Sequence, residues 1–94
     1  MTKKEFIAQV AERALFTPKE VEKVFDSMVF VLKEQLIAEE KVQLSHLGIF
    51  STVIKQERTI TNRFTGAEQV VPQKRVIKYK PSKYLRETVD IRND

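Results

Sequence analysis

The sequence has 94 residues, with 17 Lys or Arg against 13 Asp or Glu, so its formal net charge is +4. This length allows one domain, and the absence of Cys excludes a disulfide framework and a cysteine-based zinc site. The longest apolar run, Met28 to Leu32, excludes a transmembrane helix, and Glu5 and Glu12 interrupt the N-terminal apolar positions, so we expect a cytoplasmic protein without a signal peptide.

The first predicted helix begins at a capping box. Thr2 supplies a hydroxyl at the N-cap and Glu5 a carboxylate three residues later. Apolar residues then recur at the spacing of one helical face. We therefore expect a helix from Lys3 to about Ala14.

A second capping box starts the next helix. Thr17 and Glu20 form the box, and Pro18 occupies the first helical position. The helical pattern continues until Glu39-Glu40-Lys41, and its apolar residues spread around much of the circumference. A helix that is apolar on more than one side is usually buried on more than one side. Burial by a second subunit is the favoured explanation, and packing against the chain's own sheet is the alternative.

A long hairpin is predicted in the middle of the chain. Residues 41–44 read as a short strand, and residues 45–48 as a turn. Two strands rich in β-branched residues follow, Ile49 to Thr61 and Ala67 to Lys80. The link Asn62-Arg63-Phe64-Thr65-Gly66 between them contains residues suited to a tight turn.

The positive charge is concentrated on this hairpin. Between Ser51 and Lys83 the sequence contains eight basic residues, opposed only by Glu57 and Glu68. Such clustering is typical of nucleic-acid binding. A ribbon with this charge and little apolar mass of its own requires an anionic partner.

The chain is expected to end with a short helix. Pro81 stops the last strand, and Ser82 can cap a helix that runs through Val89. The whole chain, residues 1–94, is then one domain. It comprises a helical dimerisation part (1–38), a sheet and arm (41–80), a C-terminal helix (81–90) and a frayed tail (91–94).

Catalysis has little support in the sequence. His46 is the only histidine, and a surface position or a phosphate contact explains it better than a metal ligand. The two glycines form no phosphate-loop motif. We predict no catalytic residues, no metal site and no cofactor.

Three classes of partner fit the charge of the basic hairpin. A two-stranded ribbon can enter a groove of DNA, with Lys and Arg meeting phosphates. RNA modules usually stack bases on exposed aromatic residues, and the hairpin offers few of them, with Tyr79 in its second strand and Phe64 at its tip. Binding to an anionic membrane lacks the amphipathic basic helix that it would need.

Several segments resemble the bacterial HU and integration host factor family of DNA-bending proteins. They are Lys41-Val42-Gln43-Leu44, Leu47-Gly48-Ile49-Phe50, Asn62 with Thr65-Gly66, and Tyr79-Lys80-Pro81-Ser82-Lys83. The resemblance spans nearly the whole chain. It implies an α+β fold that forms an intertwined dimer. That dimer has a helical base, a three-stranded antiparallel sheet and a protruding β-ribbon arm in each subunit, and its arms enter the minor groove.

The resemblance also implies the site residues. The expected DNA contacts are Lys3, Lys55, Arg58, Thr61, Asn62, Arg63, Phe64, Thr65, Lys74, Arg75, Lys78, Lys80, Ser82, Lys83 and Arg86. The expected dimer interface comprises Phe25, Val29, Leu32, Leu36, Leu44, Leu47, Phe50 and Tyr79.

Three positions depart from the family pattern. Arg63 stands where the family usually has the tip proline that wedges between base pairs, His46 replaces a glycine in the turn, and Val53 replaces a stem arginine. We expect Arg63 to enter a narrow minor groove and Phe64 either to act as the apolar wedge or to pack across the turn. Sharp bending should therefore be weaker than in a proline-tipped relative.

The expected function is architectural binding of double-stranded DNA with low sequence specificity, by a nucleoid-associated homodimer or heterodimer. No Asn or Gln array is placed to read major-groove bases, so recognition of backbone and shape is expected. Two alternatives stay open. One is a site-specific bending cofactor of the integration host factor type, and the other is a module that binds RNA or another polyanion.

Overall fold

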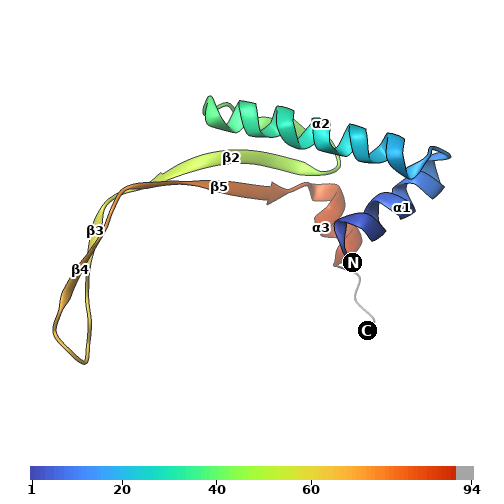
Figure 1. Ribbon diagram of the computed structural model, residues 1–94. Helices are drawn as coiled ribbons and strands as arrows, with labels where there is room; N and C mark the ends of the chain where they lie inside the picture. The colour runs from blue at the N-terminus through green and yellow to red at the C-terminus, as the bar shows by residue number, and fades with distance from the viewer. Residues whose placement is uncertain (91–94) are drawn as a thin grey trace. The chain divides into compact units, whose positions relative to one another are not determined.

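The computed structural model describes residues 1–90. Its elements are three helices and five strands (Figure 1). Their bounds are α1 (Lys3–Ala14), α2 (Pro18–Ile37), β1 (Val42–Leu44), β2 (Gly48–Lys55), β3 (Arg58–Thr61), β4 (Glu68–Val71), β5 (Lys74–Pro81) and α3 (Lys83–Val89). The chain divides into two compact units, of which the first is Met1–Gln35 and the second begins at Leu36.

Both predicted helix starts are confirmed. The Thr2 hydroxyl accepts a hydrogen bond from the Glu5 N–H at 3.2 Å. At the start of α2 the capping box is closed in both directions. The Glu20 N–H donates to the Thr17 hydroxyl at 3.2 Å, and the Thr17 N–H donates to Glu20 Oε1 at 3.0 Å. Thr17 Oγ1 also donates to that carboxylate oxygen at 2.9 Å.

The ionisation of Glu20 is clearly perturbed. The backbone N–H of Thr17, and after it the Thr17 hydroxyl, lowers the pKa of Glu20. Hydrogen bonds donated to a carboxylate favour its charged form. The charge of Glu20 therefore contributes to the start of α2.

The predicted three-stranded sheet is confirmed, with strand order β1-β2-β5 and both pairs antiparallel. Eight residue pairs join β2 to β5, from Gly48 opposite Pro81 to Lys55 opposite Lys74. The register has no bulge along this length, so side chains alternate strictly between the two faces. Which residues share a face can therefore be read directly from the pairing.

The long hairpin differs from the sequence prediction, which expected two unbroken strands. Each strand is interrupted, and β3 and β4 form a separate two-stranded ribbon, called here the arm. The gap contains Gln56-Glu57 on one strand and Pro72-Gln73 on the other. Pro72 has no N–H, so it cannot donate to the ladder at this point. In Figure 1 the two ribbons follow one another and the direction changes at this gap.

The predicted tight turn at the end of the arm is confirmed. The Asn62 side-chain oxygen accepts from the Phe64 N–H at 2.8 Å and from the Thr65 N–H at 3.3 Å. Gly66 has φ +71°, a conformation that glycine adopts without steric cost. The Asn62 N–H donates to the Ala67 carbonyl at 2.8 Å and closes the ladder below the turn.

The last predicted helix is also confirmed, and Ser82 is its N-cap. The Ser82 hydroxyl accepts from the Leu85 N–H at 3.1 Å and donates to the His46 carbonyl at 2.7 Å. One side chain thus starts α3 and fastens it to the turn between β1 and β2. The frayed tail expected at 91–94 lies outside the described residues.

Few apolar side chains are buried. Among residues 1–90 the buried apolar residues are Ile7, Ala11 and Leu36. Many large apolar residues are instead exposed, including Val29 at 50% and Phe30 at 57%. In the described part of the chain, no helix combines the length and the apolar character needed to cross a membrane.

Candidate nucleic-acid interface

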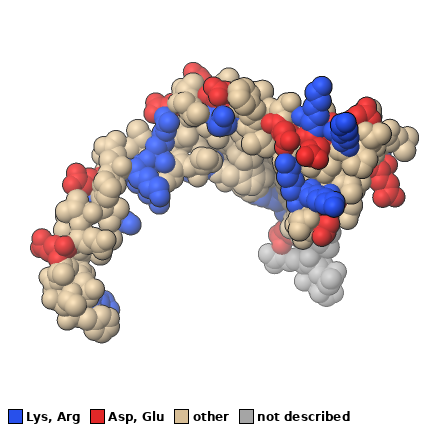
Figure 2. Space-filling model, viewed as in Figure 1, with Lys and Arg blue, Asp and Glu red and all other residues tan. Residues whose placement is uncertain are grey.

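The register of β2 and β5 separates the cations of the sheet into two groups. Lys74, Lys78 and Lys80 alternate along β5 and lie on one face, and Lys55 joins them because it pairs with Lys74. All four side chains belong to exposed residues. We call this the lysine face. Lys and Arg side chains gather where β2 and β5 lead into the arm (Figure 2).

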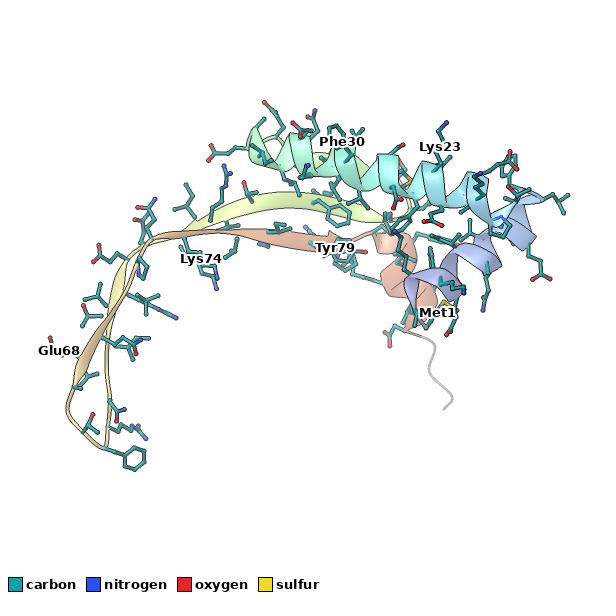
Figure 3. The ribbon with its side chains drawn as sticks, in the orientation of Figure 1. Met1, Lys23, Phe30, Glu68, Lys74 and Tyr79 are labelled. Carbon is teal, nitrogen blue, oxygen red and sulfur yellow. The ribbon has the colours of Figure 1, made fainter. Side chains whose placement is uncertain are left out.

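The opposite face of the same two strands is aromatic. Phe50 and Tyr79 are paired residues, and their ring centroids are 4.9 Å apart. The Tyr79 hydroxyl donates to the Leu47 carbonyl at 2.8 Å, which joins this face to the turn before β2. Lys74 and Tyr79 lie near opposite ends of β5 (Figure 3). The strands therefore present charge on one side and rings on the other.

Arg75 is a predicted DNA contact that does not lie on the lysine face. It follows Lys74 in the strand and so belongs to the face of Tyr79. Its Nη1 donates to Glu39 Oε1 at 3.0 Å and to the Ile37 carbonyl at 3.2 Å. These partners are more than 35 residues away in sequence, and the local patterns that located the helices and strands contain no signal for them.

A groove of about 380 Å³ lies where β5 meets α3. Lys80, Lys83, Arg86 and His46 are among the residues that line it. His46 has φ +71°, and its ring meets the Tyr84 ring edge-on at 5.0 Å. The groove therefore brings four of the predicted DNA contacts, Lys80, Ser82, Lys83 and Arg86, together with His46.

The arm carries fewer cations than its root, by which we mean the ends of β2 and β5 next to the gap, with Lys55, Lys74 and Arg75. Arg58 pairs with Val71 at one end of the β3–β4 ladder, and Thr61 pairs with Glu68 at the other. Arg58 and Thr61 are three residues apart in one strand and so lie on opposite faces. Figure 3 places Glu68 near the start of β4. A groove-binding arm would therefore present different chemistry on its two sides.

The tip presents an aromatic ring to solvent. Phe64 is 97% exposed, and Arg63 beside it is also exposed. The turn around Asn62 holds the backbone of this ring without covering its side chain. Of the two roles expected for Phe64, packing across the turn is wrong for this structure, because almost all of the ring is free of contact. The role as a wedge stays a prediction.

Lys3 lies in the first unit, where its ammonium is paired. It donates to Asp26 at 2.8 Å and stands 5.5 Å from the centre of the Phe25 ring. The hydrogen bond to Asp26 raises the pKa of Lys3. Both side chains of the pair are more than half exposed, so phosphate can compete with Asp26 for the ammonium.

Most of the residues predicted to form the dimer interface are incompletely covered by their own chain. Leu44 is 37% exposed, Leu47 41%, Tyr79 43% and Val29 50%. Phe25, Leu32 and Phe50 have intermediate exposure, and Leu36 is buried. Apolar side chains this exposed are candidates for contact with a second chain.

Comparisons with known proteins agree on one family. The family model described as bacterial DNA-binding protein matches residues 1–90. The chain is 36% identical to the DNA-binding protein HU of Thermotoga maritima, over 95% of this chain and 99% of that protein. It is 31% identical to the integration host factor subunit alpha of an Anaeromyxobacter species, over 97% and 92% of the two chains. Its fold matches the Anabaena HU–DNA cocrystal structure with a TM-score of 0.86 at 29% identity, covering 96% of this chain and 98% of that chain.

Proposed function

The chain belongs to the family of bacterial DNA-binding proteins, and on that premise we propose that it is an architectural protein that binds and bends double-stranded DNA. Two copies join through their helices and aromatic faces, the lysine face receives the duplex, and the arms enter the minor groove. Sequence specificity is low, and the protein works in the nucleoid. It has no catalytic activity, because its role is to hold and shape DNA.

The lysine face is the observation that supports this proposal most directly. Lys55, Lys74, Lys78 and Lys80 all occupy one face of two paired strands. Flexible ammonium groups in such a row suit the repeated phosphates of a polyanion, and they carry no base-specific information. The groove beside α3 extends this positive surface with Lys83 and Arg86.

Dimer formation follows from the small core. Three buried apolar residues among residues 1–90 are few for a chain of this size, and domains this small gain stability when two chains share a core. Apolar area that is exposed in one chain contributes about 25 cal/mol per Å² when a partner covers it. A second copy of the chain is the partner that supplies matching surfaces by symmetry.

A salt-resolved titration on a short duplex tests the proposal. Neutralising eight to ten phosphates, roughly, gives a log–log slope of affinity against salt of about −7 to −9. Lys78→Ala removes one ammonium from the lysine face and should make the slope less steep by about 0.9. A nearly flat salt response of the unmodified protein would contradict DNA binding through this face.

Oligomeric state is tested separately by sedimentation in dilute solution. The proposal requires two chains per particle at concentrations where DNA is bound. A particle that remains a single chain while it binds DNA would contradict the shared core.

Two other functions are distinguished by the choice of nucleic acid. Comparison of random with selected duplexes identifies a site-specific bending cofactor, which would prefer selected sequences. Competition among duplex DNA, duplex RNA and heparin at fixed salt identifies a general polyanion binder. The low number of exposed aromatic side chains on the arm, where Phe64 is the one such residue between Arg58 and Val71, favours duplex DNA over single-stranded RNA.

A further inference from the structure

We propose that Arg75 is a positioning residue that fixes the root of the arm to the C-terminal end of α2, and that it is not a phosphate contact. The inference rests on the proposed binding of DNA, because the arm that Arg75 positions is the part that would enter the groove. It replaces the role that the sequence suggested for this residue.

The C-terminal end of α2 lacks a cation of its own. The last turn contains no basic residue, and Glu39 and Glu40 follow the helix. The carbonyl groups at a helix C-terminus carry partial negative charge, so acidic side chains there are unfavourable and cations are favourable. A positive group from elsewhere in the fold is therefore favourable at this place.

Arg75 supplies that positive group from β5. One guanidinium nitrogen, Nη1, donates both to the Ile37 carbonyl and to the Glu39 carboxylate. The first bond satisfies a carbonyl of the last helical turn, and the second neutralises the acidic side chain that follows it. A guanidinium is suited to such a double contact because its donors are fixed in a plane.

Glu39 also has a backbone conformation that benefits from an added contact. Its φ is +60°, in the left-handed region that glycine or asparagine usually occupies after a helix. A residue with a Cβ loses free energy in this conformation. The bond from Arg75 to the Glu39 carboxylate compensates in part for that cost, which explains why a glutamate is compatible with this position.

The location of Arg75 gives the contact its consequence for the arm. Arg75 is the second residue of β5, directly after the gap at Pro72-Gln73 where the ladder is interrupted. Beyond the gap the strands of the arm pair with each other, β3 with β4. Arg75 belongs to the last residue pairs of the β2–β5 ladder before the gap. A contact from this residue to the helix end therefore sets the direction in which the arm leaves the sheet.

Lys74 provides a matched control. It is the adjacent residue and carries the same charge, but it lies on the lysine face, and the bonds to Ile37 and Glu39 are made by Arg75. Replacing either residue with Ala changes the net charge equally. Only Arg75→Ala should release the helix end, and only Lys74→Ala should remove a phosphate contact.

The test combines amide hydrogen exchange in the free protein with salt-resolved DNA binding. We expect Arg75→Ala to speed exchange about two- to five-fold in the last turn of α2 and at the start of β5, the modest effect of an exposed charged hydrogen bond. Glu39→Ala, which removes the other partner of the same bond, should also speed exchange at these amides. Lys74→Ala should leave their exchange unchanged. In DNA binding, Lys74→Ala should make the salt slope less steep by about 0.9, whereas Arg75→Ala should keep the slope and lower the bend angle.

Two results would overturn the inference. One is Arg75→Ala behaving as Lys74→Ala does, with a shallower salt slope and unchanged exchange. The other is Glu39→Ala leaving exchange unchanged in the last turn of α2 and at the start of β5, because the carboxylate would then not be holding Arg75 at the helix end. If the unmodified protein does not bind DNA, the proposed function fails, and the exchange measurements on free protein still decide whether Arg75 holds the helix end.

Discussion

Phe50 and Tyr79 face each other across β2 and β5 with their rings tilted by 36°. Tyr79 nevertheless remains 43% exposed, and its hydroxyl is bonded to the Leu47 carbonyl. The ring is thus placed by its own chain and only partly covered by it. We expect a second chain to cover the remainder.

Substitutions at Tyr79 separate the contribution of its hydroxyl hydrogen bond from that of its ring. Tyr79→Phe keeps the ring and removes one hydrogen bond, so it should lower the free energy of unfolding by about 1 kcal/mol. Tyr79→Ala also removes the ring and should cost about 2–4 kcal/mol. Urea denaturation at two protein concentrations measures both effects, and the Ala variant should show the larger dependence on concentration. Equal losses for the two variants would contradict a role for the ring in the shared core.

Gly48 is predicted to be irreplaceable, in contrast to Gly66. A Cβ on Gly48 would collide with the Lys80 carbonyl oxygen and lie 2.8 Å from Tyr79 Cε1, at a φ of +145°. Gly48→Ala should therefore cost about 3 kcal/mol or more. A Cβ on Gly66 meets no atom within 4 Å, although φ is +71°, so Gly66→Ala should cost only about 1 kcal/mol. Thermal unfolding of the two variants checks that Gly48→Ala loses more stability than Gly66→Ala. A larger loss for Gly66→Ala would contradict the prediction.

The capping box of α2 predicts a specific loss of stability in acid. The pKa of Glu20 is lowered in the folded chain, so its carboxylate stabilises the fold at neutral pH. That contribution disappears as the pH falls through the folded pKa. Glu20→Gln should therefore be less stable than the unmodified protein at pH 7, and the difference should shrink in acid.

Urea denaturation at neutral and acidic pH measures this change. Glu12→Gln removes the same charge from α1 and controls for the effect of net charge. A stability difference for Glu20→Gln that stays constant across this pH range would contradict the assignment.

Phe64 is predicted to determine how sharply DNA bends. Its exposed ring can insert between base pairs, but unstacking costs a few kcal/mol per step and must be recovered by contacts along the bent duplex. We expect a smaller bend than a proline-tipped relative produces, and a further decrease in Phe64→Ala. Energy transfer between the ends of a short duplex measures the angle. Ile60→Ala, which removes an exposed apolar side chain within the arm, is the control, and a large bend that survives Phe64→Ala would contradict the prediction.

Local chemistry explains which parts of the fold were predictable from sequence. The two capping boxes, the Asn62 turn and the Ser82 cap each depend on residues within four positions of one another, so their signals are contained in short segments. The long hairpin was predicted for the same reason. Its interruption is not apparent from composition, because Val70 and Val71 precede Pro72 and β-branched residues resume at Val76, although a proline without an N–H indicates such a break.

The site was less predictable because it depends on how side chains alternate between the two faces of a strand, and on hydrogen-bond partners that are distant in sequence. The sequence grouped Lys74 and Arg75 by charge, whereas strand geometry separates neighbours onto opposite faces. The partners of Arg75 precede it by 38 and 36 residues, with four strands, β1 to β4, between them in the chain. Lys3 was predicted as a phosphate contact, and its bond to Asp26 crosses 23 residues. Charge composition identifies a ligand class, and pairing register is needed to assign the individual residues.

The position of β5 at the margin of the sheet has a consequence for the behaviour of the protein at high concentration. A strand of eight residues with one unpaired side is a template on which strands of other molecules can grow. Here Pro72 precedes it, Pro81 ends it, and three lysines alternate along it. Prolines cannot donate to an added strand, and like charges repel a second copy. The residues that we assign to phosphate binding thus also protect the protein against aggregation while no DNA is bound.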